Sequence, residues 1–246
     1  MRAETEQKLN RIWYEGEAAP AWLRLLAPLY RAGNRFDRWR NTRRRPDDLG
    51  KVPIVIVGNL TVGGAGKTPL VIRLCKLFRA AGCKPGVISR GYGRKETGTR
   101  LVSPASDPGL VGDEPLLIAR QAGVPVIVSS DRCEAARKLL NKGVDVIVSD
   151  DGLQHYRLPR TLEICVVDGS RGFGNGRQLP EGPLREPMER LAEFDYVVVN
   201  GDPSAVAEEY EPVPMTLVAG LLRSLENGQS WRLAQFAGCK VNAVAG

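Results

Sequence analysis

A glycine-rich turn between a short apolar strand and a helical pattern constrains this chain more than any other feature. The strand pattern covers residues 52–57, and the turn TVGGAGKT follows at residues 61–68. Glycines let the backbone bend so that several N–H groups face one anion, and the following helix adds the positive end of its dipole. The turn therefore predicts a phosphate-binding loop and argues against a plain strand-to-helix connection.

The residues of this loop are expected to bind a nucleoside triphosphate. In loops of this type the lysine, here Lys67, reaches the β- and γ-phosphates, and the next hydroxyl, here Thr68, ligates Mg²⁺. The general pattern begins with glycine, whereas this chain has Thr61 there. The remaining glycines and the flanking strand and helix support the same interpretation, so ATP and Mg²⁺ are the expected cofactors. The full set is Thr61, Val62, Gly63, Gly64, Ala65, Gly66, Lys67 and Thr68.

Strand and helix patterns alternate after residue 50 and predict the fold class. Continuous apolar strands separated by helices are typical of a mostly parallel sheet with helices on both faces, and with the phosphate loop they indicate an α/β, P-loop NTPase-like domain. We place this domain at residues 51–235, after an N-terminal amphipathic helical segment at 1–50, and interpret 236–246 as the start of a truncated C-terminal part. Further strands are expected at 85–89, 125–129, 144–149, 162–167 and 196–199, and helices at 68–81, from 113 and at 131–141.

The composition narrows the classes of protein to which this chain could belong. No apolar run reaches the ~18 residues that a membrane-spanning helix needs, and the N-terminus lacks the pattern of a secretory signal. The five cysteines are scattered and form no C-x-x-C pair, which is typical of reduced cysteines in a cytosolic protein. His155 is the only histidine, so a histidine-rich metal site is excluded.

The N-terminal segment combines an apolar helical stripe with a cluster of arginines. The apolar residues between Trp22 and Leu29 follow the spacing of one helix face, and Pro28 is expected to kink or end the first helical piece. Residues 31–45 hold seven arginines and one aspartate, and this stretch therefore carries +6 of the formal charge of +7. Such a helix suits the headgroup region of an anionic bilayer. A packed helix with a solvated basic face and a nucleic-acid-binding stripe are the alternatives.

Charged side chains occur where strands or loops end near the expected phosphate site. Asp150 and Asp151 follow a buried strand, where a carboxylate can hold Mg²⁺ opposite the loop; the two cannot point the same way from an extended chain. Asp113 begins a helix after a glycine, and could be either a helix cap or a general base. Arg185 could neutralise transferred charge or form a structural arrangement with Glu186.

Five motifs together resemble the tetraacyldisaccharide 4′-kinase family of lipid A biosynthesis. They occur in the order found in that family and span residues 52 to about 200, so the resemblance does not depend on the phosphate loop alone. Threonine at position 61 is also what the family shows. The motifs are GNLTVGGAGKTP at 58–69, SRGYGR at 89–94, VGDEP at 111–115, SDDGLQH at 149–155 and GNGRQLPEGPLREP at 174–187.

The resemblance implies a reaction and roles for individual residues. It implies transfer of the γ-phosphate of ATP to the 4′-hydroxyl of an acylated glucosamine disaccharide 1-phosphate. Asp113 is then the base near the acceptor hydroxyl, and Arg185 and Glu186 line the site. The implied catalytic set is Lys67, Asp113, Asp151 and Arg185, and the implied metal set is Thr68, Asp150, Asp151 and Glu186.

The resemblance also implies a place of action and one departure from the family. The expected location is peripheral, on the cytoplasmic face of the bacterial inner membrane, with an anionic membrane surface as partner and no nucleic acid. Family members run further and carry a Phe-Pro-Asp-His-His motif, whose histidine is taken to support the catalytic aspartate. Since His155 is the only histidine here, we expect either a fragment or a member with impaired catalysis.

Two other functions fit parts of the sequence. A membrane-associated P-loop ATPase acting as a scaffold or positioning switch fits the loop and the N-terminal helix. Such proteins often have lysine before the double glycine, and Val62 stands there instead. A nucleic-acid-dependent ATPase could use the arginines at 31–45, but no helicase or base-stacking motif accompanies them.

Overall fold

The fold is described from a computed structural model, which covers residues 2–95, 97–224 and 226–242. The chain divides into two compact units, Met1–Met215 and Thr216–Gly246. This division falls inside the domain expected at residues 51–235. None of the helices in the described ranges is both long enough and apolar enough to span a bilayer. The smaller unit contains β9 (Leu222–Arg223), β10 (Ser230–Trp231), which pairs antiparallel with β9, and η5 (Leu233–Phe236).

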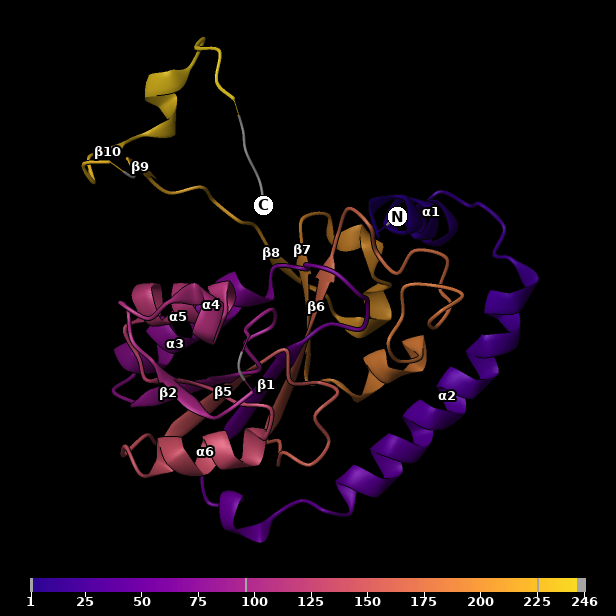
Figure 1. Ribbon diagram of the computed structural model, residues 1–246, viewed down its shortest axis with the longest axis horizontal. Helices are drawn as coiled ribbons and strands as arrows, with labels where there is room; N and C mark the ends of the chain where they lie inside the picture. The colour runs from indigo at the N-terminus through magenta and orange to yellow at the C-terminus, as the bar shows by residue number, and fades with distance from the viewer. Residues whose placement is uncertain (1, 96, 225, 243–246) are drawn as a thin grey trace. The chain divides into compact units, whose positions relative to one another are not determined.

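The larger unit is built on an eight-stranded sheet with the order β3-β4-β2-β5-β1-β6-β7-β8 (Figure 1). Neighbouring strands run parallel, except that β3 runs antiparallel to β4 at one edge. The predicted mostly parallel sheet is therefore confirmed. The strands are β1 (Ile54–Gly58), β2 (Pro85–Ser89), β3 (Arg100–Val102), β4 (Val126–Val128), β5 (Val146–Asp150), β6 (Leu162–Asp168), β7 (Tyr196–Asn200) and β8 (Val213–Met215).

Helices cover both faces of this sheet, as its continuous apolar strands require. Alternate residues of β1 show this: Val57 packs in the core under α3 and α5, while Ile56 packs in the core under α6. In Figure 1, α3 and α5 lie on one side of the strands and α6 on the other. The helices are α3 (Lys67–Ala80), α4 (Pro108–Val111), α5 (Asp113–Ala122) and α6 (Arg132–Leu140), with short 3₁₀ helices η1 (Asp47–Leu49), η2 (Met188–Glu193), η3 (Pro203–Ala205) and η4 (Glu208–Tyr210).

Two helices precede the sheet, α1 (Arg2–Tyr14) and the long α2 (Ala21–Thr42), which runs along one side of the unit in Figure 1. The expectation that Pro28 could end the first helical piece is wrong, because α2 continues through it to Thr42. Proline removes the hydrogen bond to the carbonyl four residues earlier. That carbonyl belongs to the exposed Arg24, where water can replace the lost donor.

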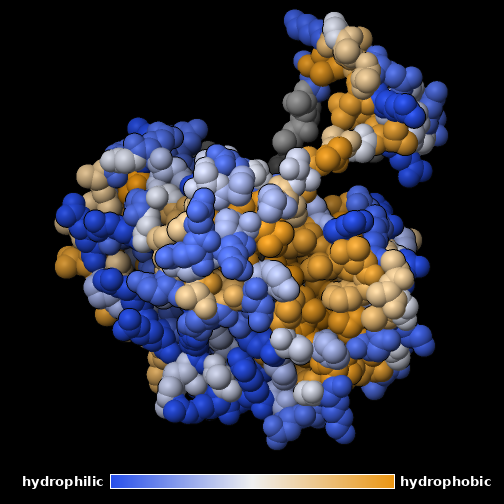
Figure 2. Space-filling view, turned by 180° about the vertical axis from the view of Figure 1, so that it is seen from behind, coloured by the Kyte–Doolittle hydropathy of each residue, from blue (hydrophilic) through white to orange (hydrophobic). Residues whose placement is uncertain are grey.

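One face of α2 is buried and the opposite face is open. Leu23 and Ala27 are buried against the unit, whereas Leu25 is 76% exposed and Leu29 is 69% exposed. Exposed hydrophobic side chains are not confined to α2, since Figure 2 shows a broad hydrophobic area on the side facing away from the viewer in Figure 1. What distinguishes α2 is therefore the combination of an apolar face with many arginines.

Candidate active site

A cavity of about 710 Å³ lies where the glycine-rich turn meets the carboxyl ends of β2 and β5. The carboxyl ends of parallel strands meet at one edge of the sheet, and ligands of open α/β sheets bind in the crevice at that edge. Most of the residues that line it are charged or polar, which suits a phosphorylated ligand. It includes Lys67, Glu114, Asp150, Asp151, His155 and Arg185.

The turn has the backbone that a phosphate loop needs. Gly63 and Gly66 have φ values of 98° and 92°, in the left-handed region that favours glycine. Gly66 precedes the first turn of α3, so the start of the helix points into the loop. The loop is held from outside, since the Val62 N–H donates to the carbonyl of Pro183 at 2.9 Å.

Lys67 is held across the loop by two partners. Its ammonium donates to Oδ1 of the fully buried Asn59 at 3.0 Å and lies 3.3 Å from Oδ1 of Asp151. The side chain is only 10% exposed, and its charge is directed into the cavity. The structure thus places the predicted lysine at the loop and at the wall of the cavity.

Asp150 is the last residue of β5 and is 1% exposed. One carboxylate oxygen accepts a hydrogen bond from Oγ of Ser89 at 3.2 Å, while the other has no partner in the described residues. Burial, reinforced by the charge of Glu114, raises the pKa of Asp150 to about 6. A buried carboxylate oxygen without a donor costs free energy unless a cation or water meets it. Asp150 therefore fits the predicted role of a Mg²⁺ ligand.

Asp151 turns away from its neighbour, as expected for adjacent carboxylates. It has a left-handed backbone with φ of 49°. Both of its oxygens lie 3.2 Å from Nη1 of Arg185. Burial alone would raise the pKa of Asp151, but Lys67 and Arg185 together hold it below its ordinary value. Asp151 is therefore ionised and shares its charge between two cations.

Arg132, which was not predicted from the sequence, holds the backbone carbonyls of both aspartates. It is 2% exposed, and its Nη1 donates to the carbonyls of Ile88 at 3.0 Å and Asp150 at 2.9 Å. Its Nη2 donates to the carbonyl of Asp151 at 3.2 Å. Burial lowers the pKa of Arg132 to about 10. An arginine at the start of a helix gives no sequence signal of this role, because most such residues are solvated.

Glu186 occupies a different position from the one expected. One of its oxygens accepts from Nε2 of Gln154 at 2.8 Å, and the other accepts from Nε of Arg190 at 2.9 Å. With 1% exposure and both oxygens engaged, Glu186 does not fit the expected role of metal ligand. Instead it orients Gln154, whose Oε1 accepts from Arg185 at 3.3 Å. The Glu186 carboxylate thus supports Arg185 indirectly, through Gln154.

The acidic pair at the start of α5 lies at the edge of the cavity. Asp113, the expected base, is the first residue of α5; both it and its neighbour Glu114 are exposed, and Glu114 is the one that lines the cavity. The preceding Gly112 has φ of 91°, and a side chain there would meet the backbone of Gly91 in the SRGYGR segment at 3.1 Å, so the position favours glycine. The structure therefore brings a second candidate base, which sequence reasoning did not select, next to the predicted one.

His155 also lines the cavity and was not predicted as a site residue. Burial, together with the nearby charges of Arg132 and Arg90, lowers the pKa of His155 to about 4. The imidazole is therefore neutral near pH 7 and offers one donor and one acceptor. Its place as the last residue of the SDDGLQH motif at 149–155 was the available signal.

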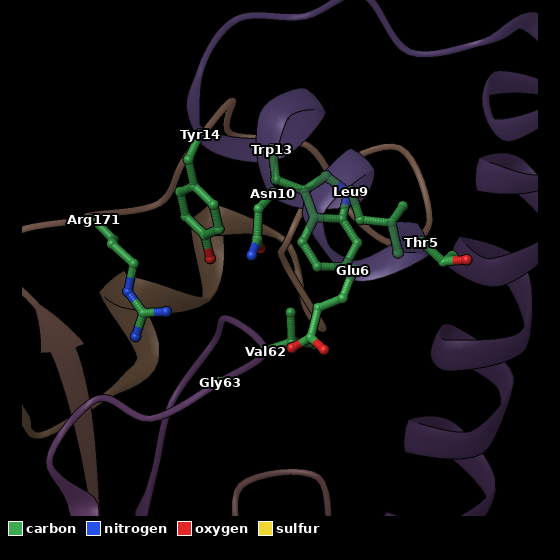
Figure 3. A pocket seen from close by; sticks show the side chains of 9 residues that line it. All are labelled: Thr5, Glu6, Leu9, Asn10, Trp13, Tyr14, Val62, Gly63 and Arg171. Carbon is green, nitrogen blue, oxygen red and sulfur yellow. The ribbon is translucent and has the colours of Figure 1, made fainter. Parts of the chain in front are cut away.

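A second cavity, also of about 710 Å³, adjoins the loop on its other side (Figure 3). It lies between α1 and the loop and shares Val62 and Gly63 with the first cavity. Arg171 borders it, donating from Nε to Asp168 at 2.7 Å and from Nη2 to the carbonyl of Gly64. The phosphate loop therefore borders a cavity on each side, and its tip residues Gly63 and Gly64 are exposed.

The residues present suit a nucleotide with a divalent cation. In the described part of the chain, no three His, Cys, Asp or Glu side chains are grouped so that they could hold a metal by themselves. Mg²⁺ does not require such a cage, because it usually keeps waters and is shared between one or two protein ligands and substrate phosphates. Thr68 at the start of α3 and the unpartnered oxygen of Asp150 provide such ligands.

Comparison with known proteins also supports a nucleotide-binding site. The sequence profile described as Tetraacyldisaccharide-1-P 4'-kinase matches residues 19–246. A tetraacyldisaccharide 4'-kinase of Stenotrophomonas maltophilia is 50% identical over 242 residues, which cover 95% of this chain and 71% of the relative. One from Chromobacterium violaceum is 50% identical over 258 residues, covering 97% and 72%. A crystal structure of LpxK from Aquifex aeolicus in complex with ATP has a TM-score of 0.67 at 28% identity, covering 86% of this chain and 69% of that one.

Proposed function

The chain belongs to the tetraacyldisaccharide-1-P 4′-kinase family, and from that premise we propose how its cavity performs the reaction. It is an ATP-dependent kinase that phosphorylates a sugar hydroxyl in lipid A biosynthesis, and it uses ATP with Mg²⁺. The observation that carries the proposal is the linked arrangement of Lys67, Asp151 and Arg185 beside the glycine-rich loop. Two cations face one carboxylate where the phosphates of a nucleotide would lie.

The loop and its lysine bind and orient the triphosphate. Backbone N–H groups of residues 63–68 surround the β-phosphate, and Lys67 moves its charge from Asp151 to the β- and γ-phosphates. Mg²⁺ would supply positive charge that offsets the negative charge developing on the leaving group. Thr68 and Asp150 would hold it, since their oxygens border the loop and one oxygen of Asp150 lacks a donor.

The transfer itself needs an ionised base and a stabilised phosphoryl group. The acceptor 4′-oxygen forms a bond to the γ-phosphorus, the bond from that phosphorus to the β,γ-bridging oxygen breaks, and ADP leaves. The hydroxyl proton passes to a carboxylate at the start of α5, which we assign to Asp113, with Glu114 as the neighbouring candidate inside the cavity. Arg185 stabilises charge on the equatorial phosphoryl oxygens.

The acceptor is acylated, and α2 provides a surface that suits its membrane. Trp22 and Leu25 are 60% and 76% exposed on one face of the helix, and exposed arginines such as Arg43 and Arg44 follow towards its C-terminal end. Amphipathic helices with aromatic and aliphatic residues on one face and arginines nearby lie in the headgroup region of anionic bilayers. We assign the chain a peripheral position on the cytoplasmic face of the bacterial inner membrane.

A transfer assay tests this function. The full chain is incubated with ATP labelled at the γ-phosphate and tetraacyldisaccharide 1-phosphate in neutral detergent micelles, and the lipid product is analysed for a 4′-phosphate. Labelled lipid is the expected result. ATP hydrolysis that ignores the acceptor would favour the scaffold ATPase, and hydrolysis stimulated by nucleic acid would favour the nucleic-acid-dependent ATPase.

A further inference from the structure

The arginines of α2 do not form one uniform basic surface. Arg31, Arg35 and Arg38 line a small cavity of about 100 Å³ together with Gln178, Glu186 and Pro187 of the loop at 174–187 (the site loop), where the Glu186 carboxylate is already engaged by Gln154 and Arg190. These arginines recur at intervals of four and three residues, so they share one flank of the helix. That flank faces the loop carrying Arg185, whereas the apolar face of α2 faces away from the unit.

The row of α2 residues next to these arginines is fastened to the active-site loop. The hydroxyl of Tyr30 donates to the carbonyl of Arg185 at 3.0 Å, and the amide nitrogen of Asn34 donates to the same carbonyl. Arg31 and Arg35 directly follow these two anchors along the chain. Because an α-helix rises ~1.5 Å per residue, the Cα atoms of Arg31 and Arg35 lie only about 1.5 Å further along the helix axis than those of Tyr30 and Asn34.

Two of these three arginines carry a positive charge that is not paired with an acidic side chain of the described residues. Arg38 pairs with Glu193. Arg31 and Arg35 are exposed, and neither has an acidic partner in the described residues. Like charges one helical turn apart repel each other unless an anion lies between them. A pair of arginines beside a substrate cavity is the arrangement that binds phosphate.

We propose that Arg31 and Arg35 bind the 1-phosphate of the acceptor disaccharide while its 4′-hydroxyl is phosphorylated in the main cavity. This inference rests on the proposed function, because the family acts on a disaccharide 1-phosphate. The two sugar rings of that acceptor separate its 1-phosphate from its 4′-hydroxyl. In the protein, the turn that carries Arg185 separates the small arginine-lined cavity from the main cavity. A phosphate dianion between two guanidinium groups sets which end of the disaccharide enters the cavity.

The remaining arginines of the segment belong to a different surface. Arg40 pairs with Asp37 at 3.5 Å, and the guanidinium of Arg43 stacks over the ring of Trp39 at 4.2 Å. Arg44 lies just beyond the end of α2, is exposed and, within the described part of the chain, makes no hydrogen bond or ion pair with the site loop. Arg44→Ala is therefore a matched control that removes one exposed arginine from the same segment.

The test compares two acceptors that differ only in the 1-phosphate. Transfer is measured in neutral detergent micelles with tetraacyldisaccharide 1-phosphate and with the same lipid after removal of that phosphate. We expect Arg31→Ala and Arg35→Ala each to raise KM for the phosphorylated acceptor about tenfold, since charged hydrogen bonds have strengths of that order, and to leave kcat largely unchanged. Both variants should use the dephosphorylated acceptor as the unchanged protein does, and Arg44→Ala should keep the full preference.

A direct binding measurement distinguishes a failure of this proposal from a failure of the proposed function. Binding of each acceptor in neutral micelles is followed by calorimetry without ATP, so it is measured even if no transfer occurs. Loss of preference for the 1-phosphate in the Arg31→Ala and Arg35→Ala proteins supports the subsite. The subsite is overturned if the substitutions weaken the binding of both acceptors equally. It is also overturned if the unchanged protein does not prefer the acceptor that carries the 1-phosphate. Arg31→Ala could instead weaken binding to phosphatidylglycerol vesicles as much as Arg44→Ala does and leave the acceptor preference unchanged. That result would assign these arginines to lipid headgroups.

Discussion

Lys67 and Asp151 form an ion pair inside the phosphate cavity, with the ammonium 3.3 Å from the carboxylate. Arg185 contacts the same carboxylate from another side at 3.2 Å. Without a nucleotide, Asp151 thus holds both cations in the place where phosphates would lie. When a triphosphate binds, its negative charge competes with Asp151 for them, so the site is charged and oriented before its ligand arrives.

Replacing Lys67 by alanine should remove phosphoryl transfer and keep the fold. We expect kcat to fall by a factor of about 10³, because a cation aimed at the transferred phosphoryl group is lost. Asp151 keeps Arg185 as a partner, so thermal unfolding should change little. Steady-state kinetics and calorimetry measure the two effects. Lys76→Ala, on the exposed side of the same helix, is the control; ATP turnover that survives in a folded Lys67→Ala protein would falsify the nucleotide-site assignment.

The two acidic residues at the start of α5 can be separated by isosteric substitution. If Asp113 is the base, Asp113→Asn should lower kcat by about 10²–10⁴ and leave ATP affinity nearly unchanged, whereas Glu114→Gln should cost much less. Rapid-quench measurement of a single turnover, with ATP affinity determined separately, distinguishes the two. The reverse order of effects would move the role of base to Glu114, the residue that lines the cavity.

Asp150 should make the nucleotide-free protein less stable at neutral pH than at mildly acidic pH. Its pKa is raised from 3.8 to about 6 in the folded state, so its favourable contribution is complete below pH 3.8 and is lost as the pH rises through 6. Relative to Asp150→Asn, the unchanged protein should therefore lose about 1–3 kcal/mol of unfolding free energy between pH 4 and pH 7.5. Urea unfolding of both proteins at each pH measures this, and parallel pH curves would contradict it.

The single histidine allows a direct check of the cavity. Because burial is the main cause of its lowered pKa, His155 should titrate near pH 4 in the folded protein and not near 6.5. Proton NMR of the imidazole follows the titration without assignment ambiguity, provided that any histidine tag is removed. Arg132 contributes to the shift, but its substitution would disturb both aspartates, so Arg90→Ala is the better variant. It should raise the pKa of His155 slightly, and a normal titration near 6.5 would show an open cavity.

Binding of α2 to membranes should have an electrostatic and an apolar part. Cosedimentation with phosphatidylglycerol vesicles should weaken with salt and in an Arg43→Ala, Arg44→Ala protein, since each basic residue near such a surface contributes about 1 kcal/mol. Arg45 is left unchanged because its Nε donates to the carbonyl of Tyr156 at 3.0 Å. Trp22→Ala and Leu25→Ala should remove the salt-resistant remainder.

Two results would contradict this assignment. Binding that responds neither to salt nor to lipid charge would remove the electrostatic part. If the unchanged protein does not bind vesicles at all, α2 is a packed helix with a solvated basic face, which was one of the alternatives left open by the sequence.

The sheet was predictable because its strands are short apolar runs separated by helical patterns. The six predicted strands and the helices α3, α5 and α6 are all present, with boundaries within two residues of those expected. The edge strand β3 was missed because Arg100–Val102 is short and partly exposed, and antiparallel pairing leaves no mark on so few residues. At Pro28, a correct local rule about proline gave the wrong result because an exposed helix face can satisfy the freed carbonyl with water.

The site was predictable where a residue type and a local motif identify it. The loop at 61–68 and the pair Asp150–Asp151 are such cases, because glycine spacing and strand ends carry the signal. Residues that act by burial were not predictable in this way. Arg132 looks like an ordinary surface residue in the sequence, and Glu186 was expected to bind a metal. Only the fold shows that both are turned inward, where a charge without partners would be costly. Tertiary packing, which no local pattern encodes, decides their roles.

The carbonyl of Arg185, held by Tyr30 and Asn34 of α2, connects the helix to the loop that borders the reaction cavity. If α2 rests in a bilayer as proposed, this attachment fixes the height of the cavity above the lipid surface. The acceptor then reaches the cavity by lateral diffusion in two dimensions, while ATP arrives from the aqueous side. Under that arrangement turnover should follow the mole fraction of acceptor in the surface and not its bulk concentration, so adding inert lipid at constant acceptor would slow the reaction by surface dilution.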